Sequence, residues 1–148
     1  MQEGTPYIMS REYLFTVENG DIMMQTKPPW GSLAAIDLAS GKLKWEQPLG
    51  MMMNPAKYPD AAKWGSINFG GATTTAGGLT FIAAGMDGFF RAFSSDNGEV
   101  LWQAMLPAAG HAAPITYELN GKQYVVIAAG GHGKLGSKLG DYIVAFSL

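Results

Sequence analysis

Asp87 and His132 are the residues whose type and position most clearly indicate chemistry. Each lies two positions beyond an Ile-Ala-Ala-Gly segment, at residues 82–85 and 127–130. This repetition places them at equivalent corners of two neighbouring units, so we expect both to face the same end of the fold. A histidine can donate a hydrogen bond to a carboxylate, and a nearby aspartate favours its charged form. An Asp-Gly pair is equally typical of a hairpin turn, so a turn role for Asp87 stays open.

Trp64 and Asn68 are two further candidates for contact with a ligand. They lie near the end of an irregular tract, residues 50–69, which precedes an expected strand. An aromatic plane can cover a flat ligand, and an asparagine amide can bond its carbonyl groups. An anchoring role within the loop explains Trp64 equally well. His111 precedes an Ala-Ala-Pro segment, and we expect it to have a capping or turn role.

Several other chemistries lack the necessary residues. The chain has no cysteine and two histidines, which excludes the usual zinc site, and it has no Gly-x-Ser-x-Gly motif. Residues 131–136 match the dinucleotide pattern Gly-x-Gly-x-x-Gly, but we expect a strand after them where a nucleotide site needs a helix. Ten Lys and Arg against 12 Asp and Glu give a net charge of −2, which excludes a broad cationic surface for nucleic acid.

The composition favours an all-β domain. With 20 Gly, 8 Pro and 15% charged residues, the chain favours short strands and tight turns over long charged helices. Its 148 residues, 47% of them hydrophobic, suffice for one domain with a core. We find neither a secretion signal at the start nor an apolar run of about 18 residues that could span a membrane, so we expect any export signal to lie outside this sequence.

An internal repeat indicates the architecture. Residues 31–45 align with residues 88–102 at a constant offset of 57, matching Gly, Ala, Gly and Trp in order, and residues 142–148 begin a third copy. In the second copy, turns that contain Gly, Asn and Asp separate expected strands at 72–75, 79–83, 89–94 and 100–105. Each complete repeat therefore reads as a four-stranded antiparallel meander.

Repeated units of four short strands are typical of β-propeller blades. We expect about three within residues 1–148: a blade at 4–49, an insertion at 50–69, a blade at 70–106 and an incomplete last blade at 110–148. Three blades do not close a ring, so the two outer blade faces need cover from further blades or from self-association.

The tract from Ala35 to Trp45, with Asp37 and Gly41 between them, resembles the tryptophan-docking motif of quinoprotein propellers. In that motif the tryptophan packs between blades. The second copy keeps the alanine, the glycine and Trp102, but has a serine in place of the aspartate. Further segments make the chain resemble the C-terminal part of membrane-bound, PQQ-dependent glucose dehydrogenases and quinate/shikimate dehydrogenases: Trp64–Ser66, Thr75–Gly78, Gly121–Val126, Ala129–Gly133 and Gly140–Ala145.

The resemblance implies part of an eight-bladed enzyme that oxidises a sugar or polyol hydroxyl, with glucose as the first candidate. Electrons would pass to PQQ and then to ubiquinone, on the periplasmic side of the inner membrane. The general base and the ligands of a Ca²⁺ or Mg²⁺ ion would lie outside this chain, which alone would be inactive and contain no catalytic residue.

The resemblance also implies roles for particular side chains. His132 and Asp87 would contact PQQ or substrate, and Asn68 and Trp64 would border the same pocket. The alternative is a non-enzymatic scaffold, since some outer-membrane assembly lipoproteins use quinoprotein-type blades to bind proteins. Such a scaffold has no need of the Gly-Gly-His-Gly segment around His132, and this favours the enzyme.

Overall fold

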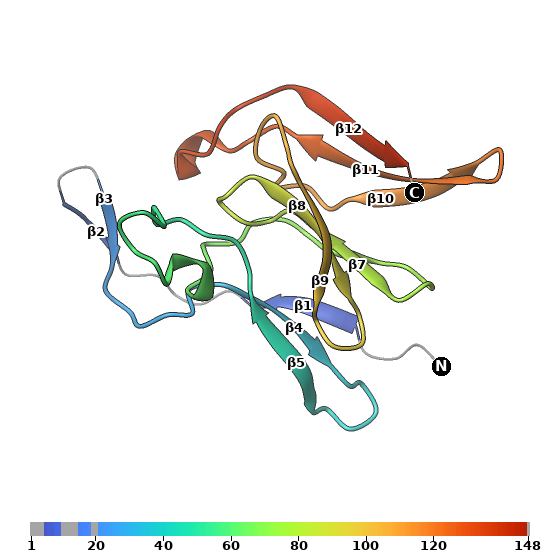
Figure 1. The fold of residues 1–148 in the computed structure, drawn as a ribbon, viewed down its shortest axis with the longest axis horizontal. Helices are drawn as coiled ribbons and strands as arrows, with labels where there is room; N and C mark the ends of the chain where they lie inside the picture. Colours follow the sequence, from blue (N-terminus) through green and yellow to red (C-terminus); the bar gives the residue numbers. More distant parts are fainter. Residues whose placement is uncertain (1–4, 10–14, 19–20, 148) are drawn as a thin grey trace.

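The computed structural model describes residues 5–9, 15–18 and 21–147, and its regular secondary structure consists almost entirely of strands (Figure 1). Its elements are β1 (Thr5–Met9), β2 (Phe15–Glu18), β3 (Asp21–Met24), β4 (Ser32–Ile36), β5 (Leu43–Pro48), η1 (Ala61–Lys63), β6 (Thr73–Thr74), β7 (Leu79–Ile82), β8 (Phe89–Ser94), β9 (Val100–Met105), β10 (Ile115–Leu119), β11 (Lys122–Ala129), η2 (Gly133–Leu135) and β12 (Tyr142–Ser147). Both η elements are short 3-10 helices. The expected all-β class is confirmed.

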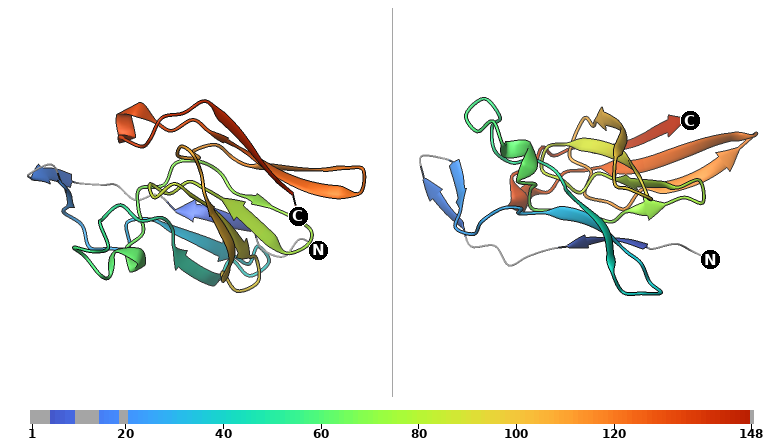
Figure 2. Two further views of the ribbon diagram at one scale, coloured as in Figure 1. Left: turned by 45° about the horizontal axis from the view of Figure 1, so that its top comes forward. Right: turned by 60° about the horizontal axis from the view of Figure 1, so that its bottom comes forward.

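Three antiparallel sheets stack in chain order, as the left view of Figure 2 shows. The first sheet has the order β1-β4-β5, the second β6-β7-β8-β9 and the third β10-β11-β12. The hairpin β2-β3 lies apart from them. The three sheets do not close a ring, as expected. No helix in the described part of the chain is long and apolar enough to cross a membrane.

The repeat found in the sequence is also a repeat of strand register. Ala35 pairs with Trp45 in the first sheet, and Ala92 pairs with Trp102 in the second. The register shifts directly after the alanine in both sheets. Such a bulge bends a strand and strengthens its twist, so the two sheets turn their outer strands in the same way.

Most predicted strands of the second repeat are present. Strands β8 and β9 have the predicted bounds, whereas the predicted strand 72–75 is reduced to Thr73–Thr74. Sequence reasoning missed the hairpin β2-β3, which lies between two paired strands of the first sheet. The blade limits stay predictions, and the expected blade starting at residue 4 includes residues 4, 10–14 and 19–20, which lie outside the described residues, as does residue 148.

The second sheet carries a hydrophobic cluster on each face because side chains alternate along a strand. Phe81 packs with Phe90 and Val125 toward the third sheet, while its neighbour Ile82 packs with Phe93 toward the first sheet. All five are almost fully buried. Burying one such side chain stabilises a fold by about 1.5–3 kcal/mol, so these two clusters hold the three sheets together.

Trp45 joins the first sheet to the second. Its indole Nε1 donates a hydrogen bond to the Ser95 carbonyl across 2.9 Å. A Cβ atom on Gly98 would lie 2.6 Å from the Trp45 ring, so only glycine permits this contact. Trp45 therefore docks on the turn of the following sheet, which is the arrangement that the motif predicts.

Candidate functional site

Four connections gather at one end of the stacked sheets, on the left in Figure 1. They are the tract before β6, the β7-β8 connection, the β9-β10 connection and the β11-β12 connection, which includes η2. Asp87 lies on the second of these and His132 on the fourth. The structure thus places both residues at the same end, as the repeat predicts.

The carboxylate of Asp87 forms an ion pair within its own hairpin. Both guanidinium nitrogens of Arg91 face it, with 3.1 Å between Nη1 and Oδ1. The backbone N–H of Phe89 also donates to Oδ1 across 3.3 Å. Only 5% of the Asp87 side chain is exposed, so the cation neutralises a charge that burial alone would destabilise. Asp87 thus has a structural role at this corner, and sequence reasoning missed its partner Arg91.

His132 presents its imidazole at the surface, beside the side chain of Phe69. The two rings stack with centroids 6.0 Å apart and planes at 24°. The backbone N–H of His132 donates to the Ser137 hydroxyl across 2.8 Å. Among the described residues, the ring nitrogens of His132 have no hydrogen-bond partner, so both are available to a ligand.

His111 lies beside His132, which sequence reasoning did not foresee. The two imidazole rings meet edge to face with centroids 6.3 Å apart. His111 belongs to the β9-β10 connection, 21 positions before His132, and no repeat or motif relates the two positions. The expected capping or turn role does not describe His111, because its ring bonds two other connections.

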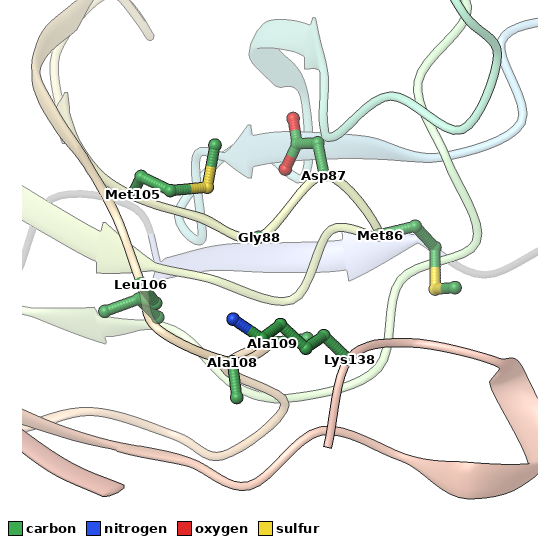
Figure 3. A pocket seen from close by; sticks show the side chains of 8 residues that line it. All are labelled: Met86, Asp87, Gly88, Met105, Leu106, Ala108, Ala109 and Lys138. Atoms are coloured by element: carbon green, nitrogen blue, oxygen red, sulfur yellow. The ribbon is translucent and has the colours of Figure 1, made fainter. Parts of the chain in front are cut away.

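A cavity of about 190 Å³ lies next to this cluster of connections and is mostly apolar (Figure 3). Its lining residues are Met86, Asp87, Gly88, Met105, Leu106, Ala108, Ala109 and Lys138. In Figure 3 the carboxylate of Asp87 and the Lys138 amine lie on opposite sides of the cavity, and the ion pair of Asp87 is with Arg91. Lys138 is therefore a cation at this cavity that is not paired with Asp87.

Trp64 lies in an aromatic cluster of the tract before β6. Its ring meets Trp30 edge to face, with centroids 5.5 Å apart, and Tyr58 at 5.9 Å. These contacts agree with the anchoring alternative, since they fix the irregular tract against the segment before β4. Whether Trp64 also covers a ligand stays a prediction.

Asn68 is buried in a polar junction between the first and second sheets. With its amide oriented so that the nitrogen faces these acceptors, Asn68 donates to the Leu49 carbonyl across 3.2 Å and to the Ser66 hydroxyl across 3.3 Å. The same hydroxyl accepts the Met86 backbone N–H across 3.0 Å. Asn68 and Ser66 therefore tie the irregular tract to the β7-β8 connection, next to Asp87. A ligand contact by Asn68 stays a prediction.

The described residues contain no group of three His, Cys, Asp or Glu side chains that could hold a metal ion. The titratable groups around His132 and the cavity include the Asp87–Arg91 pair, two imidazoles and Lys138. Such a donor set suits an anionic organic ligand better than a metal ion.

Comparison with known proteins identifies the fold. Residues 1–125 match the family described as "PQQ: Glucose/ethanol/alcohol dehydrogenase, beta-propeller domain". The structure of the quinohemoprotein alcohol dehydrogenase from Comamonas testosteroni aligns with 87% of this chain and 18% of its own, at a TM-score of 0.57 and 25% identity. The expected quinoprotein propeller is therefore confirmed.

Two curated relatives agree with this family. The quinoprotein glucose dehydrogenase of Escherichia coli (strain K12) is 48% identical over 82% of this chain and 16% of its own length. The quinate/shikimate dehydrogenase (quinone) of Acinetobacter baylyi is 38% identical over 99% of this chain and 18% of its own. The chain thus spans less than a fifth of each of these relatives. It belongs to the PQQ-dependent dehydrogenase β-propeller family.

Proposed function

We propose that this chain forms part of the PQQ pocket of a dehydrogenase that oxidises a sugar or polyol hydroxyl, with glucose as the first candidate. The observation that supports this most directly is the exposed imidazole of His132, held between other residues with both ring nitrogens available among the described contacts. The relatives named for glucose and for quinate or shikimate support the substrate class.

The residues at this end fit the chemistry of PQQ, which is a flat quinone with carboxylate groups. His132 can donate a hydrogen bond to a carboxylate or quinone oxygen, and Lys138 can add a positive charge. A Cβ atom on Gly133 would meet no atom within 4 Å, so a flat group has room beside this backbone. When bound, PQQ supplies the acceptor for the two electrons that leave the alcohol.

Each residue of the chain has a different task in this proposal. His132 orients the ligand through a hydrogen bond, and Lys138 balances its negative charge. Asp87 holds the β7-β8 connection through Arg91, so any contact that it makes with PQQ or substrate uses oxygens already bonded to a cation. Trp64 and Asn68 do not line the cavity of Figure 3, and their task in this proposal is to fix the irregular tract that would border the PQQ pocket.

The remaining machinery belongs to the rest of the full-length enzyme in this proposal. We assign the general base, the ligands of Ca²⁺ or Mg²⁺ and the further blades to that part, since the E. coli relative is about six times as long as the aligned region. Transfer of electrons to ubiquinone on the periplasmic side of the inner membrane is part of the same proposal. This chain alone would not turn over substrate.

A titration with PQQ tests the proposal. PQQ is added to this chain, alone and mixed with the remaining portion of the E. coli relative, and binding is followed by calorimetry. We expect saturable binding that His132→Ala weakens by roughly 10-fold to 100-fold, because a hydrogen bond to a charged group contributes about 1.5–3 kcal/mol.

Lys122→Ala is the matched control for this titration. Lys122 starts β11, at the opposite end of the sheet from His132, and we expect its loss to leave PQQ affinity unchanged. Equal PQQ affinities of the wild type and His132→Ala would contradict the proposed function and favour the scaffold alternative. The same holds if PQQ binds neither to the chain alone nor to the mixture.

A further inference from the structure

We propose that His111 is a positioning residue that fixes His132 through the hydroxyl of Ser137. The proposal rests on the proposed function in one respect, namely that His132 is the group that meets PQQ. His111, Ser137 and His132 come from two different connections, and their contacts link both connections to the tract before β6. The imidazole of His111 makes two of these contacts, one with the Phe69 carbonyl and one with the Ser137 hydroxyl.

The first contact fixes the tautomer of His111. Its Nδ1 lies 3.2 Å from the backbone carbonyl oxygen of Phe69. A carbonyl oxygen only accepts hydrogen bonds, so Nδ1 must carry the proton and donate it. In the neutral ring Nε2 is then an acceptor that faces Ser137.

The second contact uses this acceptor. Nε2 of His111 lies 3.0 Å from the Ser137 Oγ and is a nearer acceptor for the single hydroxyl hydrogen than the His132 carbonyl oxygen, which lies at 3.5 Å. The Ser137 Oγ also accepts the backbone N–H of His132 across 2.8 Å. The hydroxyl thus donates in one direction and accepts in the other, so the orientation that His111 imposes on Ser137 suits the bond to His132.

Ser137 also closes the segment that carries His132. Its bond to the His132 N–H spans the 3-10 helix η2 (Gly133–Leu135), and Gly136 leaves this helix in the left-handed conformation at φ 67°. Between residues 131 and 138, whose backbones are bonded to Ala109, this short glycine-rich segment depends on such side-chain contacts to fix its position. Backbone hydrogen bonds from Gly131 to Ala109 (2.9 Å) and from Ala109 to Lys138 (3.2 Å) tie its two ends to the β9-β10 connection, and the contact from His111 adds a side-chain bond between these ends.

The ring of His132 is flanked by the same residues. Phe69 stacks on one side of it, and the edge-to-face contact with His111 lies at 6.3 Å. Because His111 also bonds the Phe69 carbonyl, one imidazole fixes both the backbone of His132 and the aromatic residue beside it. A ligand-contacting group held in this way loses little freedom on binding.

Three substitutions of His111 separate its two contacts. His111→Gln places an amide near the position of Nε2, which keeps the bond to Ser137 and loses the bond to Phe69. His111→Asn places an amide near Nδ1 and does the reverse. His111→Phe keeps a ring and loses both bonds. Lys134→Ala, an exposed change in η2, is the control.

Two readouts distinguish positioning from a general loss of structure. The first is the hydrogen-exchange rate of the His132 amide in the chain without PQQ, compared with amides of β8 and β11. We expect His111→Phe and His111→Asn to raise this rate roughly 10-fold with the strand amides unchanged, and His111→Gln to restore it. The second is PQQ affinity, which we expect to follow the same order and to fall less than in His132→Ala.

Each proposal has its own contradicting result. An unchanged exchange rate of the His132 amide in His111→Phe, or rescue by asparagine in place of glutamine, would overturn the positioning role. An unchanged PQQ affinity in His132→Ala would overturn the proposed function, whatever the exchange rates. Faster exchange in the strands as well as at His132 would show a merely structural role for His111 and would also overturn the proposal.

Discussion

Trp45 and Trp102 occupy the same position in two copies of one repeat, but their surroundings differ. Trp45 is 8% exposed, bonded to the Ser95 carbonyl and packed on Gly98 of the second sheet. Trp102 is 37% exposed and contacts Phe90 of its own sheet and Phe146 of the third sheet. The strands that carry the two tryptophans do not explain the differences in exposure and in contacts, because each tryptophan pairs with an alanine beside a bulge.

The difference shows that the following sheet completes the docking site. Ala145 of β12 corresponds to Ala92 of β8 in the repeat, and its neighbour Phe146 meets the Trp102 ring edge to face with centroids 5.0 Å apart. Trp102 therefore meets the following sheet through an aromatic ring, whereas Trp45 meets it through a turn. Docking in this fold is a property of two neighbouring sheets together.

Replacing each tryptophan by alanine should have the largest and most unequal effects on the free energy of unfolding. Trp45→Ala removes a buried ring and its hydrogen bond, so we expect the free energy of unfolding to fall by about 3–5 kcal/mol. Trp102→Ala removes a ring that is one-third exposed, and we expect a loss of about 1–2 kcal/mol. Urea unfolding followed by circular dichroism measures both, and equal losses would contradict the comparison.

The turn glycines provide a second test. Gly98 and Gly41 are repeat equivalents with φ angles of 74° and 67°, but a Cβ would strike the Trp45 ring only at Gly98 and would meet no atom within 4 Å at Gly41. Alanine at either position costs about 1–2 kcal/mol of backbone strain. We expect Gly98→Ala to cost about 1–3 kcal/mol more, from overpacking. Thermal unfolding of the two variants measures the difference. Equal shifts in the melting temperature would contradict the steric role of Gly98.

The smallest expected effect is the pH dependence of the stability that Asp37 contributes in the turn before Trp45. The Ser40 backbone N–H, and then its hydroxyl, hold the pKa of the Asp37 carboxyl below its ordinary value. The contribution of Asp37 to stability is therefore present above the ordinary pKa of about 3.9 and is lost as the pH falls through the lower folded value. The second copy has Ser94 at this position and lacks this titration.

An NMR titration checks this prediction. On acidification, the Ser40 amide resonance should move in the wild type and stay constant in Asp37→Asn, while the Asp96 amide, which donates to the Ser94 hydroxyl, marks the second turn. A Ser40 resonance that moves equally in Asp37→Asn would show that another group titrates there.

Much of the fold could be predicted because the repeat acts locally and at a fixed offset. The Gly-containing turns and tryptophans determine where β8 and β9 begin and end, and both strands have the predicted bounds. The hairpin β2-β3 has no counterpart in the repeat, so no second copy indicated it. The inner strand β6 is short because Gly70 and Gly71 lie against the β9-β10 connection, which a sequence does not reveal.

Less of the candidate site could be predicted, because its contacts join distant segments. The repeat correctly placed Asp87 and His132 at one end, since each follows the same strand of its unit. It could not show that Arg91 neutralises Asp87, nor that His111 lies beside His132. These contacts depend on how loops without repeated sequence pack together.

The central claim, that His132 meets PQQ, is tested most directly by NMR of the chain labelled only at histidine. The chain has two histidines, so two ring signals report on the whole site. During a PQQ titration we expect a saturable shift of the His132 ring signal and a smaller shift of the His111 signal. Saturable PQQ binding that leaves both ring signals unmoved would contradict the claim.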